Sequence, residues 1–161
     1  MPELWDLYNE KREKTGLILE RGKSIPQGLY HIIVSAWIMN SQGQYLISQR
    51  HPNKPYPGYW ECTGGSVIAG ESSLTGAVRE IKEELGIVLT PDKARLLYQV
   101  RRDTMQDFYD VWLFQADVPI KSLKLQIDEV INAQWVSKET LSDMFQKKRV
   151  HPLIDYMEIF I

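Results

Sequence analysis

One acidic segment, residues 65–87 with the sequence GSVIAGESSLTGAVREIKEELGI, constrains the fold of this chain more than any other. Three of its carboxylates, Glu80, Glu83 and Glu84, are spaced at i, i+3 and i+4, so on an α-helix they share one face. Like charges at this spacing repel one another, and helix propensity alone gives no reason to place them together. A divalent cation bound at this face would neutralise them and would explain the pattern.

The same segment carries the apolar spacing of an amphipathic helix. Ser72 or Ser73 is suited to cap the start of this helix, and Gly86 is suited to end it. Gly76 costs about 1 kcal/mol relative to alanine in a helix interior, and a close backbone approach would be one reason to keep it. One face is therefore expected to pack into a core while the acidic face meets solvent or metal. The apolar stripe consists of Leu74, Ala77, Val78, Ile81 and Leu85.

An acidic helix is also typical of a solvated surface, with Arg79 and Lys82 forming local ion pairs. The longer spacing favours a more specific interpretation, because the segment fits the pattern G-x5-E-x7-R-E-U-x-E-E-x-G-U, in which U is apolar. This pattern resembles the Nudix box, the signature of the Nudix hydrolase superfamily. The matching residues are Gly65, Glu71, Arg79, Glu80, Ile81, Glu83, Glu84, Gly86 and Ile87.

The resemblance implies an α/β fold, a Nudix-like α/β/α sandwich with a mixed β-sheet. It also implies that the segment is a loop–helix–loop that holds Mg²⁺ or Mn²⁺ against a diphosphate, which suits carboxylate ligands. Glu83 and Glu84 would be the main metal ligands, and Glu80 would be a ligand or the base that activates water. The backbone carbonyl of Gly64 would be a further ligand.

By the same resemblance, Arg79 would pair with a carboxylate of the box such as Glu71 and fix the loop against the helix. The reaction would be attack of water on one phosphorus of a nucleoside diphosphate linked to another group. The general base stays open between the box and three acidic residues outside it, of which Glu129 is included in the predicted catalytic set. The outside candidates are Asp110, Asp128 and Glu129.

Substrate selection has to come from outside the box. Arg50, Arg101 and Tyr109 are the substrate-binding residues that we predict, because arginines contact phosphates and an aromatic ring stacks on a base. Further candidates, with core positions equally consistent for the two tryptophans, are Lys54, Tyr59, Trp60, Arg102 and Trp112.

Length and composition are those of one globular domain spanning residues 1–161. No apolar run approaches the roughly 20 residues of a membrane span. The net charge of −2 does not suggest a nucleic acid polymer as partner. Cys62 is the single cysteine, which excludes an internal disulfide and fits a reducing cytoplasm.

Segments 4–8 and 17–20 flank the polar stretch 9–16, which predicts an N-terminal β-hairpin within residues 1–22. Its edge could pair with a second subunit to form a homodimer. Segment 52–58 contains three prolines and is expected to be a loop. The predicted strands are 4–8, 17–20, 30–39, 45–48, 94–101, 108–118 and 135–136, and the predicted helices beyond the box are 137–147 and 152–160.

Segments 30–37 and 50–60 resemble the type I isopentenyl-diphosphate isomerases, a branch of the Nudix superfamily. His31 stands where those enzymes have a metal-binding histidine, although an isolated histidine on an apolar strand is also typical of a structural residue. Their catalytic cysteine would fall at positions 64–65 and a second histidine at Ser66, where this chain has neither. Their catalytic glutamate would fall at Asp110. We therefore expect hydrolase chemistry, with an isomerase or a non-catalytic nucleotide-binding module as alternatives.

Overall fold

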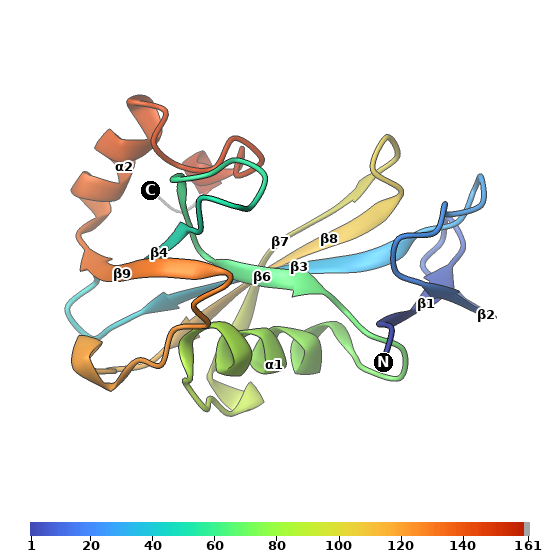
Figure 1. Ribbon diagram of the computed structural model, residues 1–161, viewed down its shortest axis with the longest axis horizontal. Coiled ribbons are helices and arrows are strands. Elements are labelled where there is room, and N and C mark those ends of the chain that lie inside the picture. Colours follow the sequence, from blue (N-terminus) through green and yellow to red (C-terminus); the bar gives the residue numbers. More distant parts are fainter. Residues whose placement is uncertain (160–161) are drawn as a thin grey trace.

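The computed structural model describes residues 1–159. It contains a mixed sheet of seven strands, a separate two-stranded hairpin and two α-helices (Figure 1). The order in the large sheet is β5-β4-β3-β8-β7, with β6 paired to β3 and β9 paired to β4. Strands β3 and β8 are parallel, as the predicted mixed sheet requires. The strands are β1 Leu4–Tyr8, β2 Lys14–Glu20, β3 His31–Met39, β4 Tyr45–Arg50, β5 Trp60–Glu61, β6 Thr63–Ser66, β7 Ala94–Arg102, β8 Asp107–Gln115 and β9 Val130–Val136.

The two α-helices pack on opposite faces of this sheet, which confirms the predicted α/β layering (Figure 1). Successive residues of β3 point to opposite faces, so Val34 packs with Ile81 of α1 while Trp37 packs with Leu141 of α2. All four of these side chains are fully buried. The helices are α1 Ser73–Leu85 and α2 Lys138–Gln146, with short 3-10 turns η1 Pro91–Lys93, η2 Ile120–Ser122 and η3 Met157–Ile159.

Helix α1 begins and ends where the sequence predicts. The Ser72 hydroxyl caps the helix by accepting from the Thr75 backbone N–H at 3.2 Å. Gly86 ends the helix in the left-handed region, at φ 71°, where a residue without a Cβ avoids strain. A Cβ on Gly76 would lie 3.0 Å from a Val67 methyl group, so this glycine marks the close packing of the helix on the preceding loop.

The helix predicted for residues 152–160 was wrong. The chain forms turns after Pro152, and only η3 is helical; position 160 lies outside the described residues. Ile154, Tyr156 and Met157 are all buried in the core on the α2 face, so the backbone follows the shape of that core rather than a helical period. The short strands β5 and β6 were not predicted, since β6 has two glycines and neither strand shows an alternating pattern.

The N-terminal hairpin is present, with β2 starting earlier than predicted. It is attached to the large sheet by reciprocal backbone hydrogen bonds between Tyr8 and Tyr30, at 2.8 and 2.9 Å. The Trp5 ring also stacks on His31, with ring centroids 4.0 Å apart. The hairpin therefore lies beside the start of β3 (Figure 1).

Candidate active site

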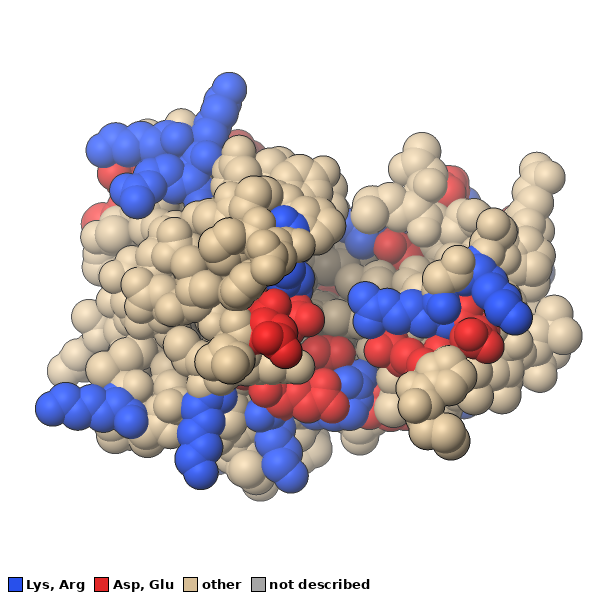
Figure 2. Space-filling model, viewed as in Figure 1, with Lys and Arg blue, Asp and Glu red and all other residues tan. Residues whose placement is uncertain are grey.

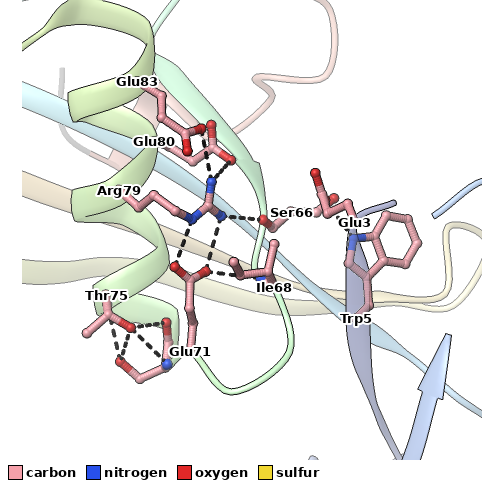
Figure 3. Close-up of polar contacts among 10 residues, drawn as sticks. Glu3, Trp5, Ser66, Ile68, Glu71, Thr75, Arg79, Glu80 and Glu83 are labelled. Carbon is pink, nitrogen blue, oxygen red and sulfur yellow. Dashed lines mark hydrogen bonds and ion pairs between the residues drawn. The ribbon is translucent and has the colours of Figure 1, made fainter. Parts of the chain in front are cut away.

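Arg79 is the centre of the polar network on α1 (Figure 3). Its Nε donates to Glu71 Oε2 at 2.7 Å, and its Nη2 donates to Glu71 Oε1 at 3.1 Å and to the Ser66 carbonyl at 2.9 Å. Its Nη1 donates to Glu80 at 3.0 Å and to Glu83 at 3.1 Å. The predicted ion pair with Glu71 is present, and the same guanidinium also joins two of the three helix carboxylates.

The third helix carboxylate, Glu84, is buried, with 8% of its surface exposed. Its carboxylate accepts a hydrogen bond from the Thr63 hydroxyl of β6. Burial raises the pKa of Glu84 to about 8, and the nearby charges of Glu80 and Glu61 add to the effect. Burial also raises the pKa of Glu80 to about 7, with Glu83 contributing. Two carboxyl groups thus lie close together in a region that disfavours negative charge.

The paired glycines of β6 let the strand run close to its neighbours. A Cβ on Gly64 would come closer than 3.0 Å to the Val34 carbonyl oxygen, and a Cβ on Gly65 would come equally close to the Glu80 carboxylate. Separations this short are essentially never observed for real Cβ atoms. The backbone at Gly65 therefore lies directly against one of the box carboxylates.

The helix carboxylates have the chemistry to hold a divalent cation, because hard cations prefer oxygen ligands. In residues 1–159, no three His, Cys, Asp or Glu side chains converge into a ready metal site. Arg79 instead binds Glu80 and Glu83, and Thr63 binds Glu84. A cation at this face would neutralise the buried Glu84 and the half-buried Glu80. The oxygen donors of these carboxylates therefore fit such an ion.

A cavity of about 170 Å³ opens beside Gly64 and Gly65. The space-filling view shows acidic side chains gathered near the middle of this face, at the lower edge of a hollow, with basic side chains among them (Figure 2). The cavity is lined by β3 and β6, by single residues of β4, β5, β7 and β8, and by the segment after α2. Its further lining residues are Ile33, Val34, Ser35, Arg50, Glu61, Cys62, Arg102, Tyr109, His151, Leu153 and Ile154.

Two of the predicted substrate-binding residues, Arg50 and Tyr109, line this cavity. Arg50 Nη1 binds both carboxylate oxygens of Glu61, at 2.7 and 3.0 Å. The Tyr109 hydroxyl lies 2.6 Å from Ser35 Oγ, and its ring is covered by the Arg102 guanidinium at 4.2 Å. Positive charge and an aromatic ring therefore meet in one cavity.

Arg101, the third predicted substrate-binding residue, lies outside the cavity. Its Nε donates to Asp103 at 2.7 Å, and its guanidinium lies over the Tyr30 ring. The adjacent Arg102 lines the cavity instead, because successive side chains of a strand point to opposite faces. Arg102 is oriented by Asp107, which accepts from it at 2.8 and 2.9 Å.

Several site residues were not predicted from the sequence. Thr63, Glu61 and His151 contact the box or line the cavity, yet none belongs to the box pattern. Glu61 is a charged residue in the short segment between Trp60 and the paired glycines. This charged residue beside the box is the signal that could have identified it. Nothing in the local sequence of His151 indicates that its segment folds back against β5.

Glu129, predicted as a catalytic residue, lies just before β9 and forms an ion pair with Lys54 of the proline-containing loop. Its charge contributes to the raised pKa of Glu61, after burial as the main cause. Glu129 therefore lies close enough to Glu61 to affect its charge, whereas Glu80 contacts Arg79.

Asp110, another candidate base, is buried at 1% exposure and is held by three donors. Arg12 of the hairpin binds both of its oxygens, with Nη1 at 2.8 Å from Oδ1, and Gln99 donates at 2.9 Å. Because these contacts are structural, we expect Asp110→Asn to lower the free energy of unfolding by about 1–3 kcal/mol while kcat stays within about threefold of the native value. Chemical denaturation and steady-state kinetics measure the two quantities, and a loss of activity without a loss of stability would contradict this.

His31 and Cys62 have the surroundings of buried structural residues. Burial lowers the pKa of His31, which stacks on Trp5, and its Nδ1 has no hydrogen-bond partner among residues 1–159. Burial raises the pKa of the Cys62 thiol to about 12, and its sulfur lies 4.0 Å from the Tyr156 hydroxyl. A thiol of this kind is a weak acid and a poor nucleophile at neutral pH.

Comparison with known proteins identifies the domain and its relatives. A family model described as the NUDIX domain matches residues 29–156. An uncharacterized Nudix hydrolase of Listeria monocytogenes is 35% identical over 160 residues, which is 98% of this chain and 94% of the relative. The isopentenyl-diphosphate Delta-isomerase of Escherichia coli is 28% identical over 136 residues, 80% of this chain and 74% of the enzyme. Both predicted resemblances are confirmed.

Solved structures agree on the fold. The crystal structure of Deinococcus radiodurans DR0079 has a TM-score of 0.76 and 24% identity, covering 97% of this chain and 98% of its own. The NUDIX domain of Shewanella oneidensis NrtR, crystallised with ADP ribose, has a TM-score of 0.61 and 20% identity, covering 81% and 85%. Among the residues that the structure describes, no helix has the length and apolar character needed to cross a membrane.

Proposed function

The chain belongs to the Nudix family of hydrolases acting on pyrophosphate bonds, and we propose that it cleaves a nucleoside diphosphate linked to another group, with Mg²⁺ or Mn²⁺ as cofactor. The observation that carries this proposal is the Arg79 network, in which one guanidinium organises Glu71, Glu80 and Glu83. The family generally uses a divalent metal ion, and the oxygen donors of α1 suit such an ion.

Each residue of the network has a role in this proposal. Glu83 and Glu84 would be the main ligands, joined by the Gly64 carbonyl, and Glu80 would be a ligand or the base that takes a proton from water. Arg79 and Glu71 would orient these groups. A bound divalent cation polarises the phosphoryl oxygens and lowers the pKa of the attacking water.

Substrate binding is assigned in this proposal to the cavity beside Gly64 and Gly65. Arg50 and Arg102 would contact phosphate oxygens, and Tyr109 would contact the remaining group. Arg102 takes the role predicted for Arg101, since only Arg102 lines the cavity. The binding of ADP ribose by the NrtR domain supports a nucleoside diphosphate as part of the substrate.

Glu129 stays a candidate general base beside Glu80. Its ion pair with Lys54 would have to open before it accepted a proton, whereas Glu80 already has a pKa of about 7, raised mainly by burial. A base whose pKa lies near neutrality is well matched to proton transfer. We also propose a homodimer formed through the edge of the hairpin, and a cytoplasmic location from the single cysteine Cys62.

A substrate screen tests the proposed function. The native protein is incubated with nucleoside diphosphate sugars, dinucleoside polyphosphates and nucleoside triphosphates, each with Mg²⁺ and with Mn²⁺, and the products are identified by mass. We expect metal-dependent release of a nucleoside monophosphate from at least one linked diphosphate. Tight binding without turnover across the whole panel would instead indicate a non-catalytic nucleotide-binding module.

The isomerase similarity gives a second candidate function. Incubation with isopentenyl diphosphate, followed by a search for dimethylallyl diphosphate, tests it. We expect no conversion, because glycines occupy positions 64 and 65, a serine occupies position 66, and the Cys62 thiol is buried with a pKa of about 12. Formation of dimethylallyl diphosphate would overturn the hydrolase assignment.

Arg79→Lys is expected to reduce kcat about 100-fold, because one ammonium group cannot reproduce five hydrogen bonds to Glu71, Ser66, Glu80 and Glu83. Steady-state kinetics on the best substrate measures this effect. Arg95→Lys, at an exposed position of β7, is the matched control and should have native kinetics. A native kcat for Arg79→Lys would show that the network does not orient the reacting groups.

A further inference from the structure

In the loop between β6 and α1, every backbone N–H from Val67 to Glu71 donates a hydrogen bond. Val67 N–H donates to the Ile32 carbonyl at 2.9 Å, and Ile68 N–H donates to Glu71 Oε1 at 3.0 Å. Glu71 N–H donates back to the Ile68 carbonyl at 3.1 Å. These three bonds lie within the Nudix domain, and they leave the two central amides to be bound from elsewhere.

The hairpin strand β1 binds both of the remaining amides. Ala69 N–H donates to the Leu4 carbonyl at 2.7 Å, and Gly70 N–H donates to Asp6 Oδ2 at 2.8 Å. Gly70 lies at φ 87°, a conformation in which glycine is favoured. The Asp6 carboxylate is also held by Lys14 of β2, at 3.3 Å. A side chain outside the matched domain thus fixes the position of the loop at Gly70.

The hairpin is a firm support because it is attached to the body of the protein independently of this loop. Arg12 at its turn binds Asp110 in the core of the sheet, and the backbones of Tyr8 and Tyr30 pair in both directions. The loop is therefore held against a part of the structure that is itself anchored.

The position of the loop is passed to the box carboxylates through Glu71. The same Glu71 carboxylate accepts from the Ile68 amide and from Arg79, and Arg79 then binds Glu80 and Glu83 (Figure 3). In that view β1 lies beside the loop, on the side away from the helix. A displacement of the loop would consequently move the guanidinium and the two carboxylates with it.

We propose that Asp6 is a positioning residue of the active site, acting through its hydrogen bond to Gly70 N–H. It touches neither the box carboxylates nor the cavity, and it lies outside the residues matched by the family model, 29–156. The N-terminal hairpin then helps to position the groups of the active site, although it contributes no residue to them. This inference rests on the proposed hydrolase function only for its kinetic readout.

Asp6→Ala and Asp6→Asn form the central test. Alanine removes the acceptor, so kcat is expected to fall about tenfold with KM within about twofold, since misplacement of oriented groups acts on the chemical step. Asparagine keeps an oxygen acceptor for Gly70 N–H and should restore most of kcat. Lys14→Ala removes the ion pair but leaves the acceptor, and should have native kinetics. Native kcat in Asp6→Ala, or an equal loss in Asp6→Asn, would overturn the proposal.

Two further measurements do not depend on turnover. Binding of Mn²⁺, followed by electron paramagnetic resonance, should weaken severalfold in Asp6→Ala and stay native in Asp6→Asn. Hydrogen exchange of the native protein should show slowed exchange at the Ala69 and Gly70 amides, and exchange as fast as in an unstructured peptide would overturn the proposal even if Asp6→Ala failed to fold. A native protein that hydrolyses no diphosphate would refute the proposed function and leave these two readouts to decide the inference.

Discussion

Glu84→Gln is expected to lower kcat/KM at least about 1,000-fold while leaving the metal-free fold as stable as the native one or more so. The substitution keeps the size of the side chain and its oxygen acceptor for the Thr63 hydroxyl. What it removes is the negative charge that, in the proposed function, holds the cation. Loss of several kcal/mol of charge stabilisation in the transition state corresponds to three or more decades in rate.

The stability part of this prediction follows from the raised pKa of Glu84. Its pKa is about 8 in the folded chain, mainly because of burial, against an ordinary value of 4.5. Between these two pH values the unfolded chain gives up a proton that the folded chain retains, so the native protein without metal loses stability as pH rises from 4.5 to 8. Glutamine does not titrate, so the free energy of unfolding of Glu84→Gln should fall less over this pH range than that of the native protein. The difference should reach up to a few kcal/mol at pH 8.

Denaturant unfolding at pH 5 and pH 8 in the presence of a chelator, together with kinetics in Mg²⁺, measures both effects. Glu139→Gln, at an exposed position in the first turn of α2, is the control and should have native kinetics and a stability within about 1 kcal/mol of the native protein. Undiminished turnover in Glu84→Gln would refute its assignment as a metal ligand. A variant less stable than the native protein at pH 8 would contradict the charge argument.

Alanine at the two adjacent glycines of β6 is expected to give two different defects. Gly64→Ala places its Cβ against the Val34 carbonyl and the Ser35 Cα, which are backbone atoms of β3. The strands would have to separate, and we expect a loss of about 3 kcal/mol in the free energy of unfolding. Gly65→Ala places its Cβ against the end of the Glu80 side chain, which is flexible and can turn away by giving up its contact with Arg79.

Gly65→Ala should therefore lose about 100-fold or more in kcat, because Glu80 is displaced, while its stability falls by no more than about 1 kcal/mol. Thermal and denaturant unfolding measure the first defect and steady-state kinetics the second. The two variants serve as controls for each other, since each adds one methyl group to the same strand. Equal losses of stability in both would contradict the separation of roles.

Local sequence predicted the parts of the site that local forces determine. The caps at Ser72 and Gly86, the helix between them and the Arg79–Glu71 pair all depend on residues within about twenty positions of one another. The cavity depends on long-range packing. Arg102 lines it instead of Arg101 because of strand register, which a sequence pattern shows only to within a residue.

The segment after α2 shows the same limit more clearly. Its apolar residues suggested a helix, but Ile154 and Tyr156 fill a core that also contains Trp37 and Tyr109, more than forty residues away along the chain. Tertiary packing overrides local propensity at such a place. The pairing of Asp6 with Gly70 N–H likewise joins residues 64 positions apart and has no signature in the sequence.

The box and one wall of the cavity come from separate stretches of chain. The box carboxylates lie on α1, whereas His151, Leu153 and Ile154 approach the cavity from a segment that follows α2. Substitutions among these three side chains would change the shape of the cavity and leave the Arg79 network untouched. If the cavity binds the substrate as proposed, a directed library at positions 151, 153 and 154 would therefore alter which diphosphate is accepted and leave the Arg79 network intact.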